Sequence, residues 1–184
     1  MKYRPLGNTG MNVSEISFGT WAIGGSWGRT DDAESLNALA RAIDAGVNFF
    51  DTADVYGDGH AEELLGKAVK GRDDIYIATK FCRAADIHDP AVYTYESVRK
   101  FCEASLKRLG LDYIDVYYCH AFDNDTPMEE TLRAMDDLVR QGKVLYVGIS
   151  NWTAAQIAEA LSIMDKYLLH RIVANQPLYN MFAR

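Results

Sequence analysis

The chain has 184 residues, of which 48% are hydrophobic and 24% are charged, and these values are ordinary for one folded domain with a sizeable core. The formal net charge of −7 and the lack of any basic run argue against a partner with a phosphate backbone. No segment approaches the roughly 20 apolar residues that span a bilayer, and the first ten residues lack the apolar stretch of a signal peptide. The sequence therefore predicts a cytoplasmic protein that binds neither nucleic acid nor membrane.

The first predicted element is a β-hairpin. Residues 2–18 hold two short alternating runs around the turn sequence Gly7-Asn8-Thr9-Gly10, and the second run leads into a first core strand at residues 16–18. Further along the chain, apolar runs bounded by polar or glycine-rich segments indicate buried strands. These five strands are predicted at residues 47–51, 75–80, 114–119, 144–149 and 172–174.

Helices are predicted between these strands from capping signals and apolar periodicity. Asp31 with Glu34, and Thr153 with Gln156, have the spacing of a capping box. The dipeptide Thr126-Pro127 combines an N-cap residue with a proline at the first helical position. Glycines mark several of the helix ends. The five predicted helices cover residues 31–45, 60–70, 98–109, 126–141 and 153–164.

This alternation of strands and helices predicts the α/β class, as a parallel (β/α) barrel of the TIM type with an N-terminal hairpin. The count reaches six strands, whereas a closed barrel of this type has eight. We therefore expect residues 1–184 to form a single barrel domain that lacks its last two βα units. Such an unclosed barrel would expose pairing edges on its first and last strands, and self-association along them is a further hypothesis.

Polar residues follow the buried strands at the edge where a parallel barrel carries its working groups. Asp51, Lys80 and His120 stand at strand ends, and Tyr56 lies in the turn after Asp51. A tyrosine hydroxyl has an ordinary pKa of about 10, which a nearby ammonium group lowers. The arrangement predicts that Tyr56 protonates a carbonyl oxygen with the help of Lys80, that Asp51 orients Lys80, and that His120 guides the substrate oxygen.

Protonation of a carbonyl oxygen achieves little unless hydride reaches the carbon, so the group implies a reduced nicotinamide. A Rossmann fingerprint is absent, because the glycines of residues 24–28 have the wrong spacing. We therefore expect any dinucleotide to lie across the mouth of the barrel.

Several segments resemble the aldo-keto reductases. They are FGTW at 18–21, DTADVYG at 51–57, ATK at 78–80, YYCH at 117–120 and GISN at 148–151. The most specific stretch, DTADVYGDGHAEELLG at 51–66, is most similar to bacterial members related to potassium-channel β subunits, and the resemblance covers essentially the whole chain.

The resemblance implies an NAD(P)H-dependent oxidoreductase that reduces aldehydes or ketones to alcohols, with NADP(H) preferred to NAD(H) and a small carbonyl compound as substrate. The catalytic residues that it implies are Asp51, Tyr56, Lys80 and His120. The implied cofactor contacts are Gly19, Thr20, Trp21, Asp51, Ser150, Asn151 and Gln176. The implied substrate pocket is lined by Trp21, Trp27, Tyr56 and His120.

Other functions stay open from the residues. A lysine at a barrel strand end can form a Schiff base, so an aldolase is one alternative. A nicotinamide-binding redox-sensing subunit and an inactive partial barrel are two more. The cysteines Cys82, Cys102 and Cys119 are odd in number and lack a C-x-x-C spacing, which favours packed, reduced thiols over a disulfide framework. The histidines other than His120 lack metal-ligand spacing, and we expect no metal site.

Overall fold

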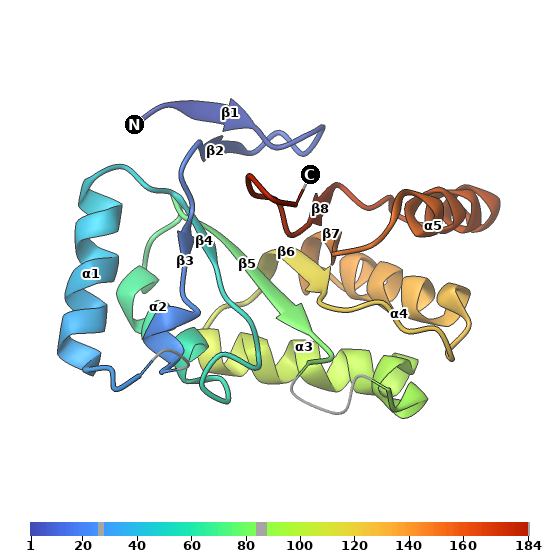
Figure 1. The fold of residues 1–184 in the computed structure, drawn as a ribbon, viewed down its shortest axis with the longest axis horizontal. Helices are drawn as coiled ribbons and strands as arrows, with labels where there is room; N and C mark the ends of the chain where they lie inside the picture. The colour runs from blue at the N-terminus through green and yellow to red at the C-terminus, as the bar shows by residue number, and fades with distance from the viewer. Residues whose placement is uncertain (26–27, 84–87, 184) are drawn as a thin grey trace.

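The computed structural model describes residues 1–25, 28–83 and 88–183, which Figure 1 shows as a ribbon. A parallel sheet forms the centre, and its strands follow one another in chain order. These strands are β3 (Phe18–Gly19), β4 (Phe49–Asp51), β5 (Tyr76–Phe81), β6 (Ile114–Cys119), β7 (Val144–Ser150) and β8 (Ala174–Gln176).

Helices connect consecutive strands and lie along the outer side of the sheet (Figure 1). They are α1 (Asp32–Asp44), α2 (His60–Val69), α3 (Tyr95–Leu109), α4 (Met128–Arg140) and α5 (Ala154–Tyr167). Two short 3₁₀ helices, η1 (Ala22–Gly24) and η2 (Pro90–Tyr93), precede α1 and α3. Parallel strands in chain order, joined by crossover helices, form a curled half-barrel of the TIM type, as the sequence predicted. Among the described residues, no helix has both the length and the apolar character needed to cross a bilayer.

The N-terminal hairpin pairs β1 (Tyr3–Pro5) with β2 (Asn12–Ser14) in antiparallel fashion. It lies at the amino-terminal ends of the parallel strands, opposite the edge where they finish (Figure 1). Met11 and Val13 pack there against Ala78, Val116 and Tyr118 on the concave side of the sheet. The predicted hairpin is therefore confirmed, and it covers one end of the inner core.

The main core lies between the sheet and the helices. All six residues of β6 are buried, because the strand has neighbours on both edges and side chains pack on both of its faces. Val116 and Tyr118 belong to the inner cluster, whereas Tyr117 and Cys119 belong to the cluster that contacts the helices. This alternation fixes which side chains of the strand can reach the barrel mouth.

The first and last strands of the parallel sheet differ from their predicted boundaries. The first core strand is Phe18–Gly19 rather than residues 16–18, and Ile16 is 64% exposed. The last strand is Ala174–Gln176 rather than residues 172–174, because Ala174 is the residue that pairs with Gly148. Each difference shows that the ladder partner, and not the apolar run, sets the limits of a strand.

The helix starts are predicted with mixed success. The Asp31 carboxylate accepts a hydrogen bond from the Glu34 backbone N–H at 3.0 Å, and Thr153 forms a full capping box with Gln156. The prediction for Thr126 is wrong: α4 begins at Met128, and the Thr126 hydroxyl donates to the Pro90 carbonyl at 3.2 Å. Helix α5 also continues to Tyr167, three residues beyond the predicted end.

Candidate active site

The carboxyl ends of β4, β5 and β6 and the loop after β4 bring a tetrad of predicted catalytic residues, Asp51, Tyr56, Lys80 and His120, to one edge of the sheet. Asp51 pairs with Ala78 and Lys80 pairs with Tyr118, so the ends of β4, β5 and β6 lie next to one another along the same edge. The loop after β4 is anchored to β5, because the Thr52 N–H donates to the Ala78 carbonyl at 2.9 Å. That anchored loop carries Tyr56.

Lys80 is the centre of the group. Its Nζ donates hydrogen bonds to Asp51 Oδ1 at 2.7 Å, to the Thr52 carbonyl at 2.7 Å and to Tyr56 Oη at 3.3 Å. The side chain is only 1% exposed. All three ammonium protons therefore have acceptors, and the charge is directed at the tyrosine oxygen.

His120 follows β6 and is buried beside Tyr56. The two ring centroids are 6.1 Å apart, with the rings nearly perpendicular. Burial lowers the pKa of His120 to about 3, and the positive charges of Lys80 and Arg83 act in the same direction. Its Nδ1 has no hydrogen-bond partner within the described part of the chain. A neutral imidazole carries one N–H donor and one acceptor nitrogen, which is a chemistry suited to binding a substrate oxygen.

Trp21 and its neighbours form the wall on the β3 side. The Trp21 ring stacks on Tyr56 with centroids 6.1 Å apart, and Trp21 is 50% exposed. Thr20 is fully buried, and its N–H donates to the Asp51 carbonyl at 2.9 Å. Gly19 pairs with Asp51 in the ladder. Three of the residues predicted for cofactor or substrate contact thus adjoin the tetrad, whereas Trp27 lies outside the described residues.

The ends of β7 and β8 place Ser150, Asn151 and Gln176 together. The Ser150 hydroxyl donates to the Gln176 carbonyl at 3.1 Å, and Asn151 Nδ2 donates to Ser150 Oγ at 3.3 Å. Gln176 Nε2 crosses the concave side to Asp51 Oδ2, at 3.1 Å. Asn151 has a φ of 59°, a left-handed conformation that asparagine tolerates well. These polar groups offer both donors and acceptors, which is the chemistry that a nicotinamide carboxamide requires.

A buried carboxyl group that the sequence reasoning did not single out lies in the same loop. Asp54 is 3% exposed, and in the described structure neither of its oxygens makes a hydrogen bond of normal geometry. Burial, together with the nearby Glu62 carboxylate, raises the pKa of Asp54 to about 7. The only sequence signal was its place in the segment 51–66, three residues after Asp51.

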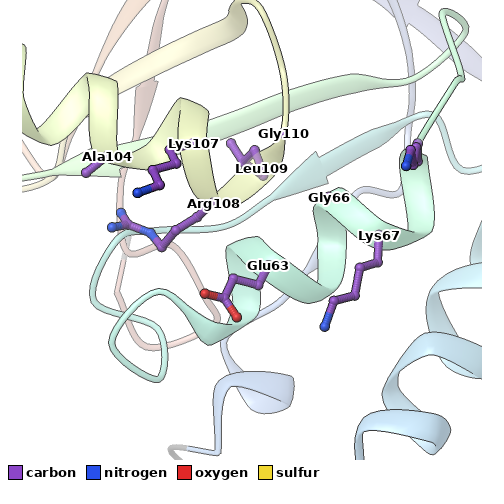
Figure 2. A pocket seen from close by; sticks show the side chains of 9 residues that line it. Glu63, Gly66, Lys67, Ala104, Lys107, Arg108, Leu109 and Gly110 are labelled. Carbon is purple, nitrogen blue, oxygen red and sulfur yellow. The ribbon is translucent and has the colours of Figure 1, made fainter.

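A groove of about 760 Å³ lies away from the tetrad, on the outer surface between α2 and α3 (Figure 2). Its lining includes Lys67, Lys107 and Arg108. The tetrad instead faces the concave side of the half-barrel, where the Gln176 side chain of β8 reaches Asp51 of β4.

The fold defines a parallel half-barrel of the TIM type with polar side chains at its strand ends, and comparison with known proteins specifies its family. Residues 15–184 match the model of the aldo/keto reductase family. The chain belongs to that family.

Among curated relatives, a probable voltage-gated potassium channel subunit beta of Arabidopsis thaliana is 42% identical over 188 residues, which is 100% of this chain and 57% of the relative. The aldo-keto reductase YhdN of Bacillus subtilis is 39% identical over 191 residues, covering 100% of this chain and 55% of that protein. A crystal structure of the thermostable aldo-keto reductase Tm1743 with the inhibitor epalrestat matches with a TM-score of 0.84 and 38% identity, over 98% of this chain and 63% of that one. The chain thus spans a little over half the length of these curated relatives.

Proposed function

We propose that this chain carries the proton-transfer site of an NAD(P)H-dependent oxidoreductase that reduces a small aldehyde or ketone to an alcohol. The observation that carries the proposal is the geometry of Lys80, whose Nζ lies 3.3 Å from Tyr56 Oη and 2.7 Å from Asp51 Oδ1. A hydroxyl beside a buried, oriented ammonium is equipped to release a proton, because the ammonium stabilises the phenolate that is left.

Each member of the tetrad has a distinct part in the proposed reaction. Tyr56 Oη gives its proton to the carbonyl oxygen as negative charge develops there. Lys80 stabilises the resulting phenolate, and the 2.7 Å contact with Asp51 keeps Lys80 oriented toward it. His120, neutral because of its pKa of about 3, holds the carbonyl oxygen by a hydrogen bond within reach of Tyr56.

The proposal includes a nicotinamide cofactor, which supplies the hydride when bound. Ser150, Asn151 and Gln176 would hold its carboxamide, since their hydroxyl and amide groups match it in donors and acceptors. The residues around Gly19 and Trp21 would hold the ring over the tetrad. We propose NADP(H) rather than NAD(H) on the family resemblance alone. A cytoplasmic location also stays a prediction.

The test is to replace Tyr56 by Phe and to follow NADPH oxidation with a panel of aldehydes. We expect Tyr56→Phe to abolish turnover while NADPH binding, measured by fluorescence quenching, is retained. The matched control is Tyr113→Phe, because Tyr113 is 47% exposed and belongs to neither the tetrad nor the wall of the pocket. Unchanged turnover in Tyr56→Phe would refute the proposed role.

A second candidate function is a nicotinamide-binding sensor subunit without significant turnover. It is favoured by the relatives named as voltage-gated potassium channel beta subunits, at 42% and 40% identity. The same titration separates the candidates. Quenching with turnover supports the reductase, quenching without turnover supports the sensor, and the absence of quenching supports an inactive partial barrel.

A further inference from the structure

A partly buried ion pair, between a fully buried Glu62 and a partly exposed Arg108, lies directly behind the tetrad. Glu62, in the first turn of α2, is completely buried, and its Oε2 accepts a hydrogen bond from Arg108 Nε of α3 at 2.6 Å. The second Arg108 contact is a 3.2 Å hydrogen bond from its terminal nitrogen to Ser105 Oγ. The tetrad chemistry described above makes no use of either charge. An ion pair with one buried partner is weak as a source of stability, so its position suggests another role.

The first connection from this pair to the tetrad runs through β5. The Thr79 hydroxyl donates to Glu62 Oε1 at 2.6 Å, and Thr79 is fully buried. Successive side chains of a strand point to opposite faces, so Thr79 faces the helices while Lys80 faces the concave side. Holding Thr79 therefore fixes the strand at the residue next to Lys80.

The second connection runs through the loop that carries Tyr56. That loop ends at Gly59, which precedes α2 and has a φ of 90°. A Cβ atom at Gly59 would lie 2.4 Å from Arg108 Cδ, so the loop packs directly on the stem of the arginine. Figure 2 shows Arg108 on α3 facing the start of α2. Arg108 thus limits how far the loop can move toward α3.

We propose that the Glu62–Arg108 ion pair is a positioning element that fixes the separation of Lys80 and Tyr56, through Thr79 on the strand side and Gly59 on the loop side. Lys80 and Tyr56 come from different segments, so their 3.3 Å contact depends on how both the strand and the loop are held. The kinetic part of this inference rests on the proposed reductase function, whereas its geometric part does not.

The experiment compares Thr79→Val with Thr79→Ser. Valine matches threonine in shape but lacks the hydroxyl donor, whereas serine keeps the donor and serves as the conservative rescue. We expect Thr79→Val to lower kcat on the order of tenfold to a hundredfold, as misplaced catalytic groups do. KM for NADPH should stay unchanged, because the cofactor contacts are on other strands. Thr79→Ser should restore most of kcat.

Crystal structures of the two variants supply a readout that does not depend on activity. In Thr79→Val, we expect Lys80 Nζ to move away from Tyr56 Oη by about 0.5 Å or more, the tolerance within which catalytic groups are held. Thermal unfolding establishes that both variants are folded. If Thr79→Val does not fold, Arg108→Lys replaces it, since lysine keeps the charge but cannot bond Glu62 and Ser105 with one planar group.

The outcomes are separable. A loss of kcat and a displaced Lys80 in Thr79→Val, both reversed in Thr79→Ser, support the inference. An unmoved Lys80 in a folded Thr79→Val protein, or equal losses in the two variants, overturns it. If the unmodified protein reduces no carbonyl compound, the proposed function fails, and the position of Lys80 alone then decides the inference.

Discussion

Replacement of Asp54 by Asn should change how the stability of the protein depends on pH. Asp54 is nearly inaccessible to solvent, and burial raises its pKa from an ordinary 3.8 to about 7. The Glu62 carboxylate adds to this effect, and the Val55 backbone N–H only partly offsets it. Asparagine has nearly the same shape as aspartic acid and carries no charge at any pH, so it mimics the protonated form.

The expected magnitude follows from proton linkage. Between pH 3.8 and about 7 the folded protein binds a proton at Asp54 that the unfolded chain does not, so the free energy of unfolding falls as the pH rises through this window. Each pH unit there is worth about 1.4 kcal/mol, which gives a total loss on the order of 4 kcal/mol by neutral pH. The contribution is fully present below pH 3.8 and lost above about pH 7. Asp54→Asn removes this dependence.

The assay is urea unfolding of the wild-type and variant proteins at a series of pH values from about 4 to about 8. Other groups titrate in this range, including Asp115 with a pKa raised to about 6 by burial, but they cancel in the difference between the two proteins. Asp54→Asn should gain stability relative to the wild type as the pH rises. Asp58→Asn is the matched control, because Asp58 is exposed in the same loop. Parallel stability curves for Asp54→Asn and the wild type would refute the reasoning.

Two further predictions concern His120 and the contact between α2 and α3. Because burial lowers the pKa of His120 to about 3, the imidazole stays neutral as the pH falls toward 4. A plot of kcat against pH should therefore show no change of slope near the ordinary histidine pKa. A change of slope there that disappears in His120→Gln would contradict this prediction. Gly66→Ala should lower the free energy of unfolding by at least about 1–3 kcal/mol. The added Cβ would lie 2.2 Å from the Leu109 carbonyl oxygen, where α2 and α3 meet (Figure 2). The free energy of unfolding is measured in urea, and a value equal to that of the wild type would show that the two helices separate freely.

The apolar pattern and the fold class together predicted where the strand-end residues of the site lie. Asp51, Lys80 and His120 each end an apolar run, and parallel strands in chain order necessarily bring such ends to one edge. Tyr56 required more than a pattern, because a loop residue is placed by anchors such as the Thr52 bond to Ala78. The sequence analysis selected Tyr56 for its chemistry beside Lys80, and the family resemblance then implied the same role.

What the sequence did not predict depends on contacts between distant segments. Glu62 and Arg108 are separated by 46 positions, and each looks like an ordinary charged residue of an exposed helix. The last strand was misplaced because residues 172–173 are apolar, whereas the ladder begins where Gly148 offers a partner. Thr126 was misassigned for a similar reason, since its hydroxyl bonds to Pro90 of a different segment.

The bond from Gln176 to Asp51 spans 125 positions of the chain and joins two strands that are not neighbours in the sheet. One oxygen of Asp51 accepts from Lys80 and the other from Gln176, so a single carboxylate is shared by the two halves of the site. If the Gln176 amide binds another partner, the Asp51 carboxylate loses one hydrogen-bond donor. The electrostatic environment of Lys80 therefore depends on the position of the Gln176 side chain, on the far side of the concave surface.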